Sequence, residues 1–199
     1  MIVFKFDNGD LDKKVSAVLG EFGDQTPNVL KNALNSTARQ ARNLLDDQAK
    51  KTYAIGKSGF AKEMKLKSAT KSRLAATITT KGPVTDLAHF KVSPKPSVGG
   101  IPPEMIRAQV KQDGGYKDLV VGSRKAFFIR FKSGHVAIAQ RKGDARLPVK
   151  TLYSISVPKM VGNEESVLNI VKPKIGDLLE QEVKKQMNSV VKKAAKAAS

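Results

Sequence analysis

The sequence predicts an α+β fold in a single domain, in which a long N-terminal amphipathic helix and a C-terminal helix pack on a mostly antiparallel β-sheet. Three observations support this fold class. A helical pattern without interruption covers residues 28–53, a hairpin pattern covers residues 127–141, and a second amphipathic pattern begins at about residue 173. Helical segments thus come before and after a run of strands, which is the order expected of an α+β domain.

The N-terminal residues predict a strand and then a helix. Apolar residues alternate along residues 2–6, which indicates a strand with one covered face. Asn8-Gly9-Asp10 ends this strand and caps a helix expected over residues 11–22. The apolar face of that helix consists of Leu11, Val15, Val18, Leu19 and Phe22.

The next segment carries the longest helical pattern of the chain. Thr26 supplies a hydroxyl N-cap, and Pro27 suits the first helical position because its missing N–H has no partner there. Small side chains recur along residues 28–53 and permit close approach of another helix or of a sheet. The stripe consists of Leu30, Ala33, Leu34, Thr37, Ala38, Ala41, Leu44, Leu45 and Tyr53.

The region between this helix and the hairpin is predicted to be mostly extended. Phe60 and Met64 at i, i+4 spacing predict a short helix that begins at Ser58. Residues 74–81 and 87–92 have the composition of strands. Residues 93–115 are rich in proline and glycine, which predicts a long protruding loop with one strand at 105–110.

The hairpin is the centre of the predicted sheet. If Ser133 and Gly134 form a two-residue turn, Phe131 faces Val136 and Ile129 faces Ile138. That register predicts one apolar face, covered by the long helix and formed by Phe127, Ile129, Phe131, Val136 and Ile138. Residues 148–157 continue as a further extended segment.

The C-terminal region predicts two helices. Asn163 caps the first, with Glu164 and Glu165 in its first turn, and Pro173 interrupts the pattern. The second is amphipathic, and its apolar stripe consists of Ile175, Leu178, Leu179, Val183, Met187, Val190 and Val191. Two interpretations of this lysine-rich helix stay open, namely binding to a membrane surface and, favoured by the lack of tryptophan and phenylalanine, packing against its own sheet or a neighbouring subunit.

Composition excludes several functions. The 199 residues include no cysteine, so thiolate metal sites, disulfides and cysteine nucleophiles are excluded. No apolar run is long enough for a membrane span, and no secretory signal is recognised, so a cytoplasmic location or a particle assembled there is expected. The formal net charge of +18 points to nucleic acid, an anionic membrane or an acidic protein as partner.

The sequence does not predict an enzyme, a metal site or a cofactor. His89 and His135 lie in separate strand-like segments, and no pair of acids has the spacing of an acid/base or metal site. Gly56-Lys57-Ser58 resembles the end of a phosphate-binding loop, but Lys51 occupies the position where that motif requires glycine.

Basic residues with few interspersed acids form the candidate binding site. They are Lys57, Lys62, Lys65, Lys67, Lys71, Arg73, Arg124, Lys125, Arg141, Lys142 and Arg146. A solvated surface and contact with DNA or an acidic partner are both compatible with them. Aromatic residues are not interleaved with these cations, and no helix-turn-helix or RNA-recognition signature is present, so any contact with nucleic acid is expected to be non-specific.

The order of these features can be compared with known families. The helix beginning VLKNALNSTARQAR precedes a lysine-rich segment with LKSAT, two strands, a loop and the stretch AFFIRFKSGHVAIAQRKGDARLPV. This order resembles the phage minor tail protein Z family, the tail completion proteins at the head-proximal end of phage tails. The similarity covers residues 29–158, apart from the 93–115 loop. The matching hairpin positions are Ala126, Phe128, Ile129, Ser133, Gly134, Gln140, Arg141, Arg146 and Pro148.

The resemblance implies a structural virion protein rather than an enzyme. It implies a ring of identical subunits, expected to be a hexamer, that joins the tail tube to the terminator or connector. Implied partners are further copies of the chain, the tail tube, the tail terminator, the tape measure protein and double-stranded DNA in the lumen, but no membrane. The particle is a virion, or a headless phage-tail-like particle without DNA. Charge alone supports the alternative of a non-specific nucleic-acid-binding protein.

Overall fold

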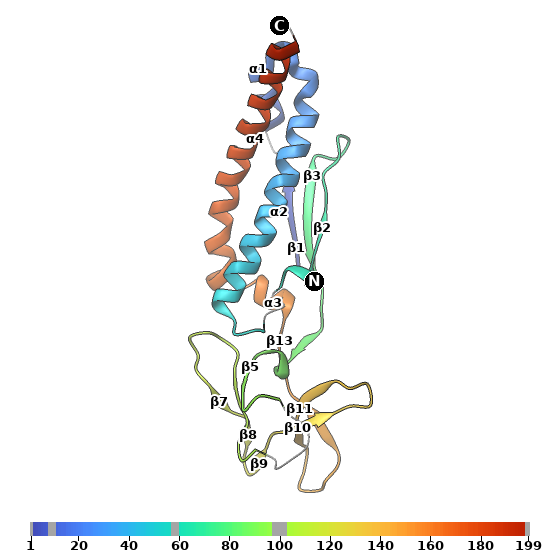
Figure 1. The fold of residues 1–199 in the computed structure, drawn as a ribbon, viewed down its shortest axis with the longest axis vertical. Helices are drawn as coiled ribbons and strands as arrows, with labels where there is room; N and C mark the ends of the chain where they lie inside the picture. Colours follow the sequence, from blue (N-terminus) through green and yellow to red (C-terminus); the bar gives the residue numbers. More distant parts are fainter. Residues whose placement is uncertain (1, 8–10, 57–59, 97–102, 198–199) are drawn as a thin grey trace.

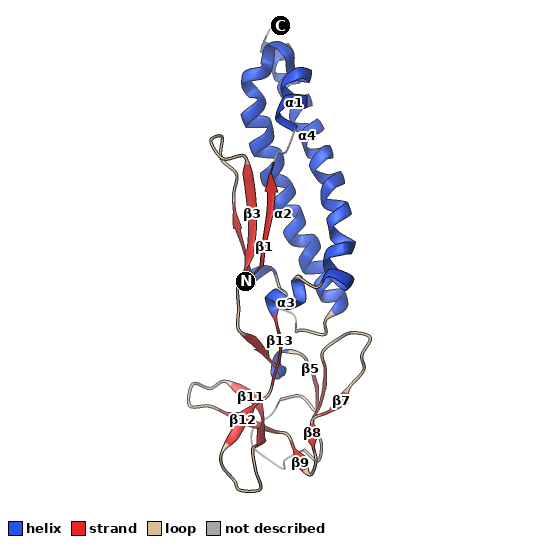
Figure 2. Cartoon of the chain, turned by 180° about the vertical axis from the view of Figure 1, so that it is seen from behind, coloured by secondary structure: helices blue, strands red, loops and turns tan. Residues whose placement is uncertain are grey.

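The chain folds into an elongated molecule with two halves (Figures 1 and 2). The computed structural model describes residues 2–7, 11–56, 60–96 and 103–197. One half, called the helical half, contains the long helices and a sheet beside them. The other, called the strand half, contains residues 84–156 and consists of short strands and connecting loops. The α+β class expected from the sequence is confirmed, with the N-terminal and C-terminal helices packed together and several small antiparallel sheets.

The helical half is built from α2 (Thr26–Thr52) and α4 (Asn169–Ala197), which lie side by side, with α1 (Leu11–Leu19) against one end (Figure 1). A 3-10 turn, η1 (Gly20–Gln25), connects α1 to α2. The predicted small-residue stripe of the long helix is confirmed, because all of its members except the half-buried Leu44 are buried. α2 therefore lies where neighbouring elements cover this stripe of side chains.

Two predictions at the helical N-terminus were wrong. Thr26 is not an N-cap, because η1 runs directly into α2 and Gln25 before it already has helical backbone angles. Val18 and Phe22 are exposed rather than buried, since α1 turns Val15 and Leu19, with the half-buried Leu11, toward the neighbouring helices. Phe22 lies in the 3-10 turn, whose tighter winding takes it off the face that α1 defines. The cap proposed at residues 8–10 lies outside the described residues.

One sheet belongs to the helical half. It contains β1 (Ile2–Asp7), β3 (Ala75–Thr80) and β2 (Met64–Lys67) in that order, all antiparallel, and α2 packs on it. The helix expected from Ser58 was wrong: the described part of that segment is a 3-10 turn, η2 (Ala61–Glu63), followed by β2. Phe60 and Met64 are both fully buried, as two residues on one face of a helix would be. They are buried by a turn and a strand instead.

The strand half consists of four small antiparallel sheets among the described residues instead of the single sheet expected. Their orders are β5–β6–β7, β10–β11–β12, β13–β4 and β8–β9. The strands are β4 (Val84–Asp86), β5 (Lys91–Ser93), β6 (Arg107–Gln109), β7 (Lys117–Asp118), β8 (Val120–Val121), β9 (Arg124–Lys125), β10 (Phe127–Arg130), β11 (Val136–Arg141), β12 (Val149–Thr151) and β13 (Tyr153–Ser156).

Four predicted extended segments, in this half and beside it, have mixed outcomes. The strand at 74–81 is confirmed as β3, and the one at 105–110 as β6. The segment 87–92 is partly a 3-10 turn, η3 (Leu87–His89), because the Asp86 carboxylate accepts the Ala88 N–H and starts a turn there. The extended segment 148–157 divides at Leu152, whose N–H donates to Ile138 O, and continues in another sheet.

The hairpin has a register one residue away from the predicted one. Phe131 pairs with His135 around a three-residue turn, in which Gly134 has a φ of +83°. Phe128 therefore lies opposite Ile138, and the predicted apolar face is wrong, because a shift of one residue exchanges the faces. Phe131 becomes 42% exposed. The hairpin is also not covered by the long helix, whose sheet is β1–β3–β2.

The C-terminal helix is longer than predicted. Asn163 caps it as expected, since its side chain accepts the Ser166 N–H at 2.9 Å. A helix, α3 (Val157–Val161), and a π-helical turn, η4 (Glu164–Leu168), lead into α4. Pro173 does not end the helix, because a proline costs a helix one backbone hydrogen bond but can be retained where packing holds the flanking turns. Here Val171 and Ile175 on either side contact the core.

The two halves are joined by one continuous core. The last buried residues of α2, together with Tyr53, share a cluster with Phe90, Ile106 and Ile138 of the strand half. Backbone hydrogen bonds strengthen this connection, because Ala54 N donates to Val110 O and Lys91 N donates to Ala54 O. The segment after α2 thus acts as an additional strand beside the first sheet of the strand half.

Candidate functional site

The predicted basic residues of the first group lie in the helical half. Lys65 and Lys67 are exposed on the outer face of β2, while Met64 and Leu66 point to the side of α2. Lys65 pairs with Thr79 and Lys67 with Thr77, and Lys5 of β1 lies across from Thr77 on the other side. This sheet face therefore carries the threonines of β3 between two lysines of β2 and Lys5 of β1.

The rest of that group surrounds the sheet. Lys62 on η2 and Lys71 in the β2–β3 loop are exposed, and Lys57 lies outside the described residues. Arg73 is half-buried, and its guanidinium donates to Ser68 O at 2.6 Å. Asn35 of α2 fixes the same loop, because its side-chain amide accepts the Ala69 N–H and donates to Ala69 O. Arg73 is thus partly used to hold the loop in place.

The second group lies in the strand half. Arg124 and Lys125 form β9, Arg141 ends β11, and Lys142 and Arg146 are exposed in the loop before β12. The buried Gln140 side chain donates to Arg124 O at 2.6 Å and brings β9 to the end of β11. The cations at the two ends of the hairpin therefore meet, but they do not meet the first group, which lies beside α2 (Figure 1).

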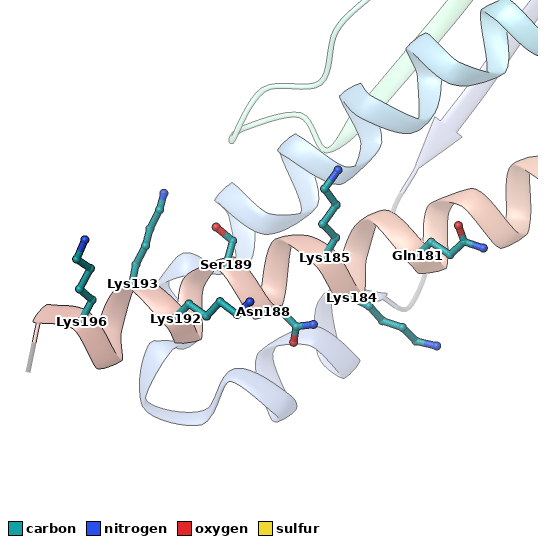
Figure 3. Close-up of a pocket in the computed structure, with 8 residues that line it drawn as sticks. All are labelled: Gln181, Lys184, Lys185, Asn188, Ser189, Lys192, Lys193 and Lys196. Atoms are coloured by element: carbon teal, nitrogen blue, oxygen red, sulfur yellow. The ribbon is translucent and has the colours of Figure 1, made fainter.

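A third cationic surface was not among the predicted site residues. The exposed side of α4 carries a shallow groove of about 670 Å³, called the lysine groove, whose side chains are shown in Figure 3. Lys185 and Lys193 extend from one side of the helix and Lys184 from another. The groove is lined by Gln181, Lys184, Lys185, Asn188, Ser189, Lys192, Lys193 and Lys196.

The sequence of α4 explains the positive charge of this surface. No acidic residue follows Glu182 in the helix, and of the five lysines after it Lys185 pairs with Glu182 at 3.7 Å, so the other four have no acidic residue after them in α4. Lysines near a helix C-terminus also offset the negative end of the helix dipole. The opposite side of α4 is used for packing, since Val183 is buried and Leu179, Met187 and Val190 join the cluster with α1 and α2.

A pocket where the two halves meet combines acids with aromatic rings. This junction pocket has a volume of about 390 Å³ and includes Glu63 from η2. His135 Nε2 lies 3.0 Å from Oδ2 of Asp86, whose Oδ1 accepts the Ala88 N–H. The centroid of the His135 ring lies 6.0 Å from that of the Phe131 ring and 6.2 Å from that of the His89 ring.

Sequence reasoning missed this pocket because no local pattern marks it. Asp86 and His135 are 49 positions apart, and the predicted register placed Phe131 in the core instead of beside His135. The chain contains two histidines, and folding brings both into this pocket. The one signal that could have identified the pocket is the proximity of the two histidines, and only the fold reveals that proximity.

Among the described residues, no group of three or more histidine or acidic side chains is placed to hold a metal ion. Lys50, on α2, has a perturbed pKa. Its Nζ donates a hydrogen bond to the Asp46 carboxylate at 2.6 Å, and this bond raises the pKa of Lys50. Asp46 also accepts the Phe60 and Ala61 N–H groups, so its role is to fix the chain after α2.

No helix within the described residues is long and apolar enough to cross a membrane. Comparisons with protein-family models, with curated proteins and with solved structures find no match to this chain.

Proposed function

We propose that this protein is a structural subunit, without catalytic activity, that assembles through its strand half into a ring at the head-proximal end of a phage tail or of a phage-tail-like particle. The observation that carries this proposal is the distribution of exposed apolar side chains. Seven of the twelve large apolar or aromatic residues that are exposed among the described residues belong to the strand half. They are Val84, Tyr116, Val120, Val121, Phe131, Leu147 and Tyr153.

Open strand edges in the same half support assembly further. The sheet of β8 and β9 has two strands of two residues each, and Val120 and Val121 on it are exposed. Short sheets leave backbone N–H and C=O groups unpaired at their edges, and these groups are satisfied when a strand from another chain is added. Exposed apolar side chains beside such edges are the composition expected of a subunit interface.

The resemblance of the sequence to the minor tail protein Z family supports a location for the proposed assembly in the tail. A ring between the tail tube and the terminator or connector has further copies of itself, the tube and the tape measure protein as neighbours. The cationic surfaces of a chain with a net charge of +18 then face acidic neighbours or DNA in the lumen. The hexamer expected from the resemblance remains part of this proposal.

Sedimentation and negative-stain microscopy of the purified protein test the proposal. We expect concentration-dependent assembly into closed rings, and Val121→Asp is expected to prevent it because a charge replaces an exposed apolar contact. The matched variant Val18→Asp changes an exposed valine in the helical half and should assemble normally. A protein that stays monomeric at every concentration and does not join isolated tails contradicts the proposal.

The lysine groove favours a second candidate function, non-specific binding to the phosphate backbone of nucleic acid. Its lining contains lysines and uncharged hydrogen-bonding groups but no aromatic side chain on which unpaired bases could stack, so a duplex is the expected ligand. The logarithm of the binding constant falls with the logarithm of the salt concentration by about 0.9 for each phosphate neutralised. Replacing Lys185, Lys192 and Lys196 by glutamine should therefore reduce the slope by about 2–3, and an unchanged slope excludes the groove as the duplex site.

A further inference from the structure

The junction pocket differs in charge from the rest of the molecule. The chain contains 36 lysine and arginine residues against 18 acids, yet neither lysine nor arginine is among the residues that line this pocket. Two of the lining residues, Glu63 and Asp86, are acidic. A cation is therefore attracted to this pocket, whereas the two groups of basic residues and the lysine groove repel it.

The walls of the pocket are suited to a flat cation. Tyr153 is 56% exposed and Phe131 is 42% exposed, so both rings are accessible at the mouth. The Phe131 and His135 rings are nearly parallel, with an angle of 9° between their planes. A guanidinium group stacks on aromatic rings of this kind and gains both dispersion and electrostatic attraction from their faces.

The junction pocket also contains hydrogen-bond acceptors for a guanidinium group. In the tautomer that carries its hydrogen on Nε2, His135 donates to the Asp86 carboxylate and presents Nδ1 as an acceptor. Glu63 is exposed on η2 at the rim and supplies a carboxylate. An arginine side chain carries five N–H donors in one plane and can use both kinds of acceptor while stacking on a ring.

We propose that the junction pocket binds an arginine side chain from a second copy of this chain, and that Arg146 supplies it. This inference rests on the proposed function. Arg146 is exposed in the loop before β12, makes no ion pair with a described residue, and precedes Leu147, which is 69% exposed. A charged group followed by an apolar anchor fits a pocket whose rim carries Val84 and Tyr153.

The contact joins two different surfaces of the chain, the loop of one copy and the pocket of the next. Such a head-to-tail contact generates a ring when its rotation closes. Arg146, one of the basic residues at the ends of the hairpin, then has a protein partner and does not require nucleic acid. The charge on Arg146 is then a determinant of assembly.

The first arm of the test uses a small probe, N-acetyl-arginine amide. Both histidines of the chain line the pocket, so their imidazole C2–H proton signals report on it directly. We expect both signals to shift and to saturate at about 10 mM probe, as for a single weakly held group, while N-acetyl-glutamate amide leaves them in place. Glu63→Gln should weaken the probe about fivefold, and Glu104→Gln, a change at another exposed acid, should not.

The second arm measures self-association by sedimentation. Glu63→Arg and Arg146→Glu should each abolish it when alone. Mixing the two variants should restore association, because Arg146 of one variant meets Glu63 of the other and the exchanged contact forms in the opposite direction. The double variant should also associate, because its charges are exchanged. Absence of any histidine shift, or normal association of Arg146→Glu, overturns the inference. If the wild type still forms rings in that case, the proposed function is not affected. A wild type that binds the probe but never associates contradicts the proposed function instead.

Discussion

The two halves of the molecule use their apolar residues in opposite ways. In the helical half, Leu30 and Leu34 of α2 are completely buried against α1, α4 and the neighbouring sheet. In the strand half, Leu147 and Val121 are more than half exposed. The helical half buries most of its large apolar residues within the chain, and the strand half exposes more of them, which we propose a neighbour covers.

Secondary structure explains why the division falls where it does. A helix satisfies its backbone groups within itself, so α2 and α4 need only side-chain contacts, and they supply these to each other. A strand must find its partners elsewhere, and sheets of two or three strands leave edges.

The largest expected effect is on the stability of the helical half. Leu34→Ala removes a fully buried side chain that packs with Ala38, Ala69 and Ala76. Loss of burial and the cavity left behind should lower the free energy of unfolding by about 2–5 kcal/mol. Denaturant titration followed by circular dichroism measures it.

The matched change in the strand half is Leu147→Ala. Its side chain is 69% exposed, so the free energy of unfolding of the monomer should change by less than about 0.5 kcal/mol. Self-association should weaken by about fivefold or more, as for a truncated interface residue. Equal loss of stability in both variants removes the distinction between the halves.

The next effect tests the connection from α2 into β2. Asp46→Ala removes the acceptor of the Phe60 and Ala61 N–H groups and the partner of Lys50. Because the Phe60 N–H is buried, we expect a loss of about 3 kcal/mol in the free energy of unfolding. Asp47→Ala, one position further on an exposed side of α2, serves as the control and should be nearly neutral. A loss below about 1 kcal/mol for Asp46→Ala contradicts this assignment.

A smaller and more local effect is expected in the strand half. Gln140→Ala removes the buried amide that donates to Arg124 O, so β9 loses its attachment to β11. The free energy of unfolding should fall by about 1–2 kcal/mol, and amide exchange should accelerate mainly in β8 and β9. Gln181→Ala, at an exposed position of α4, is the control. Acceleration throughout α2 instead shows that the halves do not open separately.

The smallest effect concerns pH. Asp46 raises the pKa of Lys50 above its ordinary value of 10.5, so the protonated amine is favoured in the folded state. The stabilisation is complete below pH 10.5 and is lost as the pH rises through the raised pKa of the folded state. Thermal melting between pH 9 and about 12 should show this loss in the wild type but not in Lys50→Met. Equal alkaline loss in both proteins contradicts the pairing.

The sequence predicted the helical half better than the strand half for a physical reason. The stripe of α2 repeats over many turns, so single deviations such as the half-buried Leu44 do not change the conclusion. The hairpin depends on one turn, and Ser133-Gly134 fits both a two-residue and a three-residue connection. Choosing the first shifted the register and placed Phe131 in the core, although it is exposed.

Long-range arrangement was the other part that the sequence could not supply. The basic residues were recognised as exposed, but their division between β2 and the ends of the hairpin depends on the fold. The contact between His135 and Asp86 requires two sheets to meet. Pro173 was taken as a helix end because local propensity opposes it, whereas contacts of the flanking turns with the core override that preference.

Hydrogen exchange at increasing protein concentration tests most directly the claim that the helical half is complete and the strand half is finished by neighbours. In dilute protein, amides of α2 and of α4 near Val183 should exchange slowly, and those of β8, β9 and the loop before β12 should exchange rapidly. Assembly should protect the strand-half amides selectively and leave α2 unchanged. Protection that does not depend on concentration, or that appears only along the lysine groove, contradicts the account.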